Sequence, residues 1–93
     1  MEKKVPSVAD LKTARRKPRE EAVRELLHLR SLIPHGERGR MTAIRMAVQC
    51  AGNNLVLLQE IYQAVPTRSR IARRVDEKIR QVESGIQARY LLA

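Results

Sequence analysis

The sequence is poor in the residues that build disulfides, aromatic cores and base-stacking surfaces. Its 93 residues include one cysteine, two tyrosines, and neither tryptophan nor phenylalanine. A single cysteine excludes an internal disulfide framework, and the core of the fold has to be aliphatic. Proteins that read single-stranded nucleic acid stack its bases on aromatic side chains. The composition therefore disfavours that class of binding.

Further absences argue against enzymes, metalloproteins and membrane proteins. The two histidines, His28 and His35, fall on the polar side of a predicted helix and in a loop. Cys50 lies in an apolar row with no base beside it, and no His/Cys set has metal-site spacing. No uninterrupted apolar run is long enough for a signal peptide or a membrane span. We expect an intracellular protein, cytoplasmic or nuclear (or nucleoid), without catalytic residues, cofactor or metal.

The charge of the chain is large, positive and concentrated at the two ends. The formal net charge is +9, from 19 basic and 10 acidic residues. Residues 1–19 carry +5 and residues 67–93 carry +4, whereas the middle of the chain is close to neutral. Such a distribution is typical of a protein that binds a polyanion.

Three long segments repeat apolar residues every three or four positions, the spacing of an amphipathic helix. The strongest covers residues 40–65, where two neighbouring apolar rows form one broad face. We predict a continuous central helix there, with Gly52-Asn53-Asn54 as an alternative local kink. Two further helices are predicted, over residues 18–33 and from residue 67 or 69 to residue 91.

The expected fold is all-α, a small bundle of three main helices plus a short N-terminal helix. Residues 1–17 are predicted to form a basic arm or that short helix, since Ser7 and Asp10 have capping-box spacing. Residues 18–93 form the helical domain. A chain this small leaves much of its surface wet, so we expect homodimerisation through the central helix. The predicted interface comprises Ile44, Val48, Ala51, Asn54, Leu55, Leu58 and Tyr62.

Asn54 is the one polar member of that predicted interface. A buried asparagine can fix the register of a helix pair by bonding to its mate in the partner helix. The alternative is a position at the edge of the apolar face, from which the side chain reaches water.

The most specific local signal is a group of arginines at the start of the last predicted helix. The helix dipole makes cations there unfavourable, by a few tenths to about 1 kcal/mol each. An anionic ligand would reverse that sign, because free N–H groups and guanidinium forks suit phosphate oxygens. The alternative is a solvated basic face, partly offset by Asp76 and Glu77. The predicted phosphate contacts are Arg68, Arg70, Arg73 and Arg74.

Two further basic groups are predicted to contact the polyanion, one around the short N-terminal helix and one near the loop before the central helix. The alternatives are a disordered basic tail for the first group and simple solvation for the second. The first group follows the short N-terminal helix and comprises Lys12, Arg15, Arg16, Lys17 and Arg19. The second, near the loop before the central helix, comprises Arg38, Arg40 and Arg45.

Three families of nucleic-acid-binding proteins share partial patterns with the sequence. Residues 57–79 resemble a helix-turn-helix in their apolar positions, but Tyr62 and Pro66 stand where a small residue and glycine are usual. Residues 26–34 resemble the end of the first helix of basic helix-loop-helix proteins, although Pro18 interrupts the basic helix that family requires. Long basic helices are similar, in architecture alone, to the double-stranded-RNA binders of viral silencing suppressors. None of the three patterns assigns the chain to a family.

These features predict non-catalytic binding of double-stranded nucleic acid. Duplex binding needs mainly arginine and lysine, and a DNA-binding regulator is preferred to a double-stranded-RNA-binding protein such as a silencing suppressor. A helical adaptor that grips a protein partner is the alternative from another class. Binding of a basic amphipathic helix to an anionic membrane surface is a third option, disfavoured because the last helix is not strongly apolar.

Overall fold

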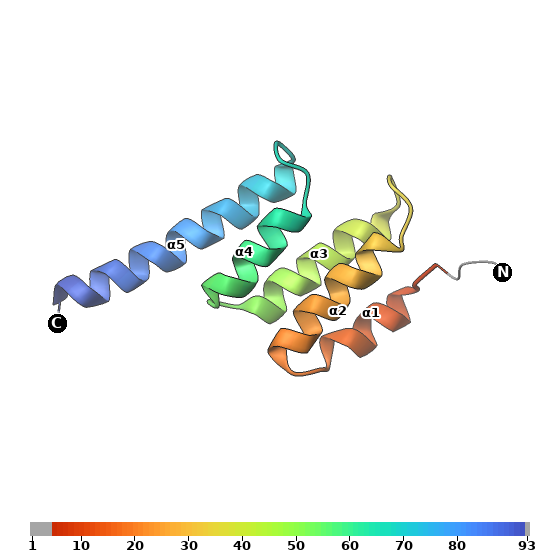
Figure 1. The fold of residues 1–93 in the computed structure, drawn as a ribbon, viewed down its shortest axis with the longest axis horizontal. Helices are drawn as coiled ribbons and strands as arrows, with labels where there is room; N and C mark the ends of the chain where they lie inside the picture. The colour runs from red at the N-terminus through yellow and green to blue at the C-terminus, as the bar shows by residue number, and fades with distance from the viewer. Residues whose placement is uncertain (1–4, 93) are drawn as a thin grey trace. The chain divides into compact units, whose positions relative to one another are not determined.

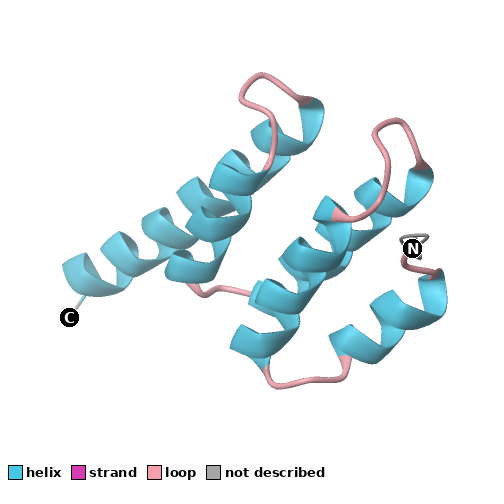
Figure 2. Ribbon diagram, turned by 45° about the vertical axis from the view of Figure 1, so that its right-hand side comes forward, coloured by secondary structure: helices cyan, strands magenta, loops and turns pink. Residues whose placement is uncertain are grey.

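A computed structural model describes the backbone of residues 5–92 and the side chains of residues 5–86. All regular structure in this part of the chain is helical, which confirms the all-α prediction (Figures 1 and 2). The helices divide between two compact units, Met1–Ala51 and Gly52–Ala93. They are α1 (Val8–Arg15), α2 (Arg19–Ser31), α3 (Arg38–Ala51), α4 (Leu55–Ala64) and α5 (Arg70–Leu92).

The first unit is a three-helix arrangement in which each helix contacts the other two. Its α1 begins at the predicted capping box: Ser7 Oγ accepts from the Asp10 N–H, and the Asp10 carboxylate accepts from the Ser7 N–H at 2.8 Å. Leu11 and Ala14 are buried as their spacing predicts, whereas Val8 is 54% exposed. Residues 8–15 therefore form the short helix and not an extended arm.

The α2–α3 pair is fastened at its open end by Arg40. The last carbonyls of a helix have no partner within the regular helix, and at the end of α2 the Leu29 and Arg30 carbonyl oxygens accept from the N–H groups of Leu32 and Ile33, both at 3.0 Å. The Arg40 Nη1 donates to the carbonyl oxygens of Arg30 at 3.1 Å and Ile33 at 2.8 Å. This half-buried side chain thus ties the start of α3 to the end of α2.

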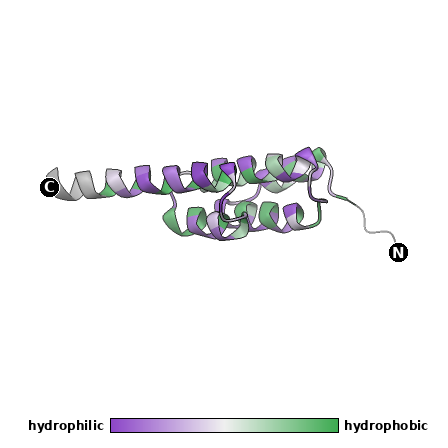
Figure 3. Cartoon of the chain, turned by 90° about the horizontal axis from the view of Figure 1, so that it is seen from above, coloured by the Kyte–Doolittle hydropathy of each residue, from purple (hydrophilic) through white to green (hydrophobic). Residues whose placement is uncertain are grey.

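The second unit is a helical hairpin of α4 and α5, joined by residues 65–69. Pro66 follows the end of α4, and Ser69 caps α5 as predicted, because its Oγ accepts from the Ala72 N–H at 3.1 Å. Along α5, the helix that leads to the C-terminus, hydrophilic and hydrophobic segments alternate in the coloured part (Figure 3). The buried apolar side chains of the hairpin are Leu57, Leu58, Ile61, Val65, Ala72, Val75 and Ile79.

The prediction of one continuous central helix is wrong. Residues 40–65 form α3 and α4, separated at Gly52, Asn53 and Asn54. Gly52 has φ +55°, a left-handed conformation that glycine adopts without steric cost at the end of a helix. Asn54 then caps α4, its Oδ1 accepting from the Leu57 N–H at 3.1 Å. The kink alternative was closer, but the result is a full break and a new helix.

The break also changes the predicted dimer interface. The interface was predicted for one continuous helix over residues 40–65, and those residues belong to two helices, α3 and α4. Ile44, Ala51 and Leu58 are already buried within a single chain, with at most 2% exposed. Val48 and Leu55 are half-buried, and Tyr62 is 37% exposed. The Asn54 side-chain oxygen accepts a hydrogen bond within its own helix. Its predicted role in fixing the register of a helix pair therefore has no support here.

Candidate nucleic-acid interface

Arg68, Arg70, Arg73 and Arg74, here called the α5 arginine cluster, lie where the loop of residues 65–69 enters α5. Ser69 fixes this geometry by accepting from the Ala72 N–H and donating to the Pro66 carbonyl oxygen at 2.8 Å. Because α5 begins at Arg70, its three helical arginines stand three and four positions apart and share one side of the first turn. All four side chains are exposed.

Within the described side chains, no acidic group pairs with this cluster. Among residues 5–86, none of the four guanidinium groups forms a salt bridge. The first turn of α5 contains no acidic residue. Asp76, which the sequence offered as a partial offset, pairs with Arg80 at 3.1 Å between its Oδ2 and the Arg80 Nε. The spacing of this pair, four residues on one helix, was a signal in the sequence that our prediction overlooked.

The start of α5 contrasts with those of α1 and α2, although α3 also lacks an acid in its first turn. The first turns of α1 and α2 carry Asp10 and the pair Glu20 and Glu21, which the helix dipole favours. The α5 cluster places positive charge at a positive helix end, and its arginines repel one another at this spacing. A bound anion would relieve both costs and would find guanidinium donors on all sides.

The N-terminal basic group is exposed on α1 and on the turn that leads to α2. Lys12, Arg15, Arg16 and Arg19 form no salt bridge within the described residues 5–86. Lys17 differs, because its Nζ lies 3.1 Å from the Glu25 Oε2. The group therefore keeps most, and not all, of its predicted members available to an anionic ligand.

The third predicted group is divided by the structure. Arg38 and Arg45 are exposed on α3. Arg40 is half-buried and engaged with the end of α2, so its Nη1 is occupied without any ligand. Partial burial, and secondly the charge of Arg40, lower the pKa of the neighbouring Arg30 guanidinium. We therefore leave Arg40 out of the candidate contacts. The sequence gave no signal for this role, which depends on where the chain turns.

Cys50 has the environment of a packing residue. Its thiol donates weakly to the Arg15 carbonyl oxygen at 3.9 Å. Burial raises the pKa of the Cys50 thiol, and the positive charge of Arg15 opposes this without cancelling it. The thiolate, the nucleophilic form, is thus disfavoured at neutral pH.

The described residues offer neither a cluster of metal ligands nor a membrane-spanning helix. They contain no group of three or more His, Cys, Asp and Glu side chains that could hold a metal ion. None of their helices is long and apolar enough to cross a membrane.

Comparisons with known proteins add no relatives. The chain matches no protein-family model, no curated protein and no solved structure.

Proposed function

We propose that this chain binds double-stranded nucleic acid without catalysing a reaction on it, with the α5 arginine cluster as the principal phosphate contact. The observation that carries the proposal is the first turn of α5, which contains no acidic residue and whose exposed arginines form no salt bridge among residues 5–86. Folding stability alone favours acids at such a position. Lys12, Arg15, Arg16 and Arg19 supply further contacts, and Arg38 and Arg45 fewer.

A duplex is favoured because its phosphate backbone can be bound mainly by arginine and lysine, without aromatic side chains. A single-strand reader needs a platform of aromatic side chains. Within residues 5–86 the one aromatic side chain is Tyr62, which is 37% exposed; Tyr90 lies outside the described side chains. Duplex DNA is the preferred ligand, in the role of an intracellular regulator, and double-stranded RNA comes second. Association as a homodimer belongs to the same proposal.

Binding titrations across several salt concentrations test the proposal, with labelled duplex DNA, duplex RNA and single strands of equal length. We expect a steep fall of affinity with salt and a preference for duplexes. The double variant Arg70→Ala/Arg73→Ala should lower the slope of log affinity against log salt by about 1.8 on B-DNA, since each phosphate contact contributes about 0.9.

A matched control removes two positive charges that already have acidic partners. Arg24 pairs with Glu20 at 3.7 Å, and Arg80 pairs with Asp76 at 3.1 Å. The variant Arg24→Ala/Arg80→Ala should leave the salt slope almost unchanged. Equal losses in the two double variants would mean that net charge, and not the α5 arginine cluster, determines binding.

A protein adaptor is the second candidate, and exposed apolar side chains favour it. Val56 is 64% exposed, and Leu32 and Met41 are each 43% exposed. Weak binding, equal for duplexes and single strands, would overturn the nucleic-acid proposal in favour of this one.

A further inference from the structure

The two helices of the second unit differ greatly in length. The α4 helix has 10 residues and α5 has 23, so they extend about 15 Å and about 35 Å at 1.5 Å per residue. Because residues 65–69 join them directly, α4 can run back along the first half of α5 only. The second half of α5 has no helix of its own unit beside it (Figure 1).

The apolar face of α5 continues past the point where α4 stops. Ala72, Val75, Ile79, Val82 and Ile86 follow one another at steps of three, four, three and four, which are the a and d positions of a heptad seam. The exposed fraction along this seam rises from 1% at Val75 to 8% at Ile79 and 45% at Ile86. The seam is thus covered at its beginning and open at its end.

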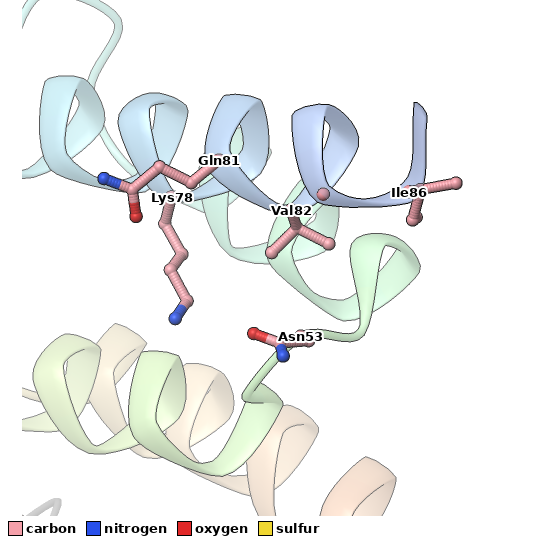
Figure 4. Close-up of a pocket in the computed structure, with 6 residues that line it drawn as sticks. Asn53, Lys78, Gln81, Val82 and Ile86 are labelled. Atoms are coloured by element: carbon pink, nitrogen blue, oxygen red, sulfur yellow. The ribbon is translucent and has the colours of Figure 1, made fainter. Parts of the chain in front are cut away.

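A hollow marks the place where the cover ends. It is lined by Asn53, which precedes the cap of α4, and by Lys78, Gln81, Val82, Gly85 and Ile86 of α5. Lys78 and Val82 project from α5 on the side where Asn53 lies (Figure 4). The start of α4 is therefore level with Val82, and the seam beyond it can accept the side chains of another helix.

The charges that flank this seam are complementary to a second copy of the same seam. With Val82 and Ile86 at d and a positions, Lys78 takes a g position and Glu83 the following e position. In a parallel pair of helices, a g residue meets the e residue five positions on in the partner. Lys78 then meets Glu83 of the second copy, twice by symmetry. Neither side chain has a salt-bridge partner among residues 5–86.

An antiparallel pair does not gain this complementarity. There, e positions meet e positions, so the flank that carries Asp76 and Glu83 faces itself. The charge pattern consequently selects both the occupant and its direction.

We propose that a second copy of this chain covers the open seam, with the two α5 helices parallel and Val82 and Ile86 each packed against its own mate. This inference rests on the homodimer included in the proposed function and specifies its interface, on a surface separate from the α5 arginine cluster, so that it is tested without nucleic acid. Parallel pairing also brings the two arginine clusters to the same end of the dimer, where one duplex can contact both.

Sedimentation of the full chain over a range of concentrations, without nucleic acid, tests the proposal. We expect a monomer–dimer equilibrium. Lys78→Glu and Glu83→Lys should each raise the dimer dissociation constant by about fivefold to tenfold, because two attractive pairs become repulsive. The double variant Lys78→Glu/Glu83→Lys should restore the dissociation constant. The control Glu77→Lys reverses a charge outside the seam and should change little.

Disulfide trapping tests the direction of the pair. Ile86→Cys, made with Cys50→Ala so that it is the one thiol, places two cysteines at facing a positions of a parallel dimer, within disulfide reach. Diamide should convert most of the dimer to the cross-linked form. A chain that stays monomeric at every concentration overturns the proposal and leaves the seam to a different protein. A dimer that neither cross-links nor is rescued by the double charge swap overturns it as well.

Discussion

The two units of this chain bury aliphatic helix faces in different ways. In residues 1–51 each of three helices contacts the other two. The middle of the apolar side of α2 is fully enclosed, with Leu26 at 0% exposure. In residues 52–93 two helices of unequal length form a hairpin, and the seam of the longer one emerges at Ile86 with 45% exposure. The spacing of apolar residues therefore predicts which side of a helix is buried, but not what covers it.

The two units also differ in the charges at the starts of their helices. In the first unit, α1 and α2 carry acids in their first turns, which the helix dipole favours, whereas the first turn of α3 has none. The start of α5 is capped by the Ser69 side chain, and its exposed arginines form no salt bridge among residues 5–86. The second unit thus exposes an apolar seam at Ile86 and a group of arginines at the start of α5, the two features on which the proposals above rest.

The largest expected effect contrasts the enclosed core with the open seam. Leu26→Ala removes a fully buried side chain and should lower the free energy of unfolding by about 2–5 kcal/mol. Ile86→Ala should cost less than about 1 kcal/mol in the monomer, because its side chain is largely in water already. Denaturant unfolding at low protein concentration measures both. Leu32→Ala, at a residue 43% exposed, is the matched leucine control.

Equal losses for Leu26→Ala and Ile86→Ala would break the comparison. They would mean that the end of α5 is covered within the single chain.

The second prediction concerns the hydrogen bonds by which Arg40 links α3 to the end of α2. Arg40→Met keeps the length of the side chain but removes the donor to the Arg30 and Ile33 carbonyl oxygens. We expect a loss of about 2 kcal/mol, typical of a hydrogen bond to a charged group, although the Arg30 carbonyl oxygen keeps the Ile33 N–H as a donor. Arg45→Met, at an exposed position on the same helix, should change the free energy of unfolding by less than about 0.5 kcal/mol. A similar small effect for both would show that Arg40 is only a solvated charge.

Local chemistry made much of the fold predictable. The capping-box spacing of Ser7 and Asp10 predicted the start of α1, and the start of α5 was predicted at residue 67 or 69. Both were predictable because capping depends on residues a few positions apart. The exposure of the α5 arginines was also predictable from their place on the helix. The Arg40 contacts were not, since they join residues that meet only after α2 and α3 have packed.

The break in the central segment shows where periodicity fails. Val48, Ala51, Leu55 and Leu58 keep their three- and four-residue steps straight across it, so the apolar pattern is the same with or without a break. The signal was the pair of residue types at the junction, a glycine that ends a helix and an asparagine that starts one. Weighing that pair above the pattern would have separated the two units.

The third prediction uses glycine to distinguish the junction from a helix interior. Gly52→Ala places a Cβ at φ +55° and should cost about 1 kcal/mol. Gly85→Ala lies within α5, with nothing within 4 Å of the added Cβ, and should stabilise the chain by about 1 kcal/mol. Thermal unfolding compares the two variants. A continuous central helix would require Gly52→Ala to stabilise as well, so its sign alone decides between one helix and two.

The smallest expected effect lies at Asn54, which caps the first helix of the second unit. Asn54→Ala removes the acceptor for the Leu57 N–H and should lower the free energy of unfolding by about 0.5–1 kcal/mol, whereas Asn54→Ser should retain most of the cap. The loss should be the same at every protein concentration, because the cap acts within one chain. Denaturant unfolding at two concentrations, with the exposed neighbour variant Asn53→Ala as control, measures it. A loss that grows with concentration would return Asn54 to a dimer interface and weaken the case that α5 alone provides it.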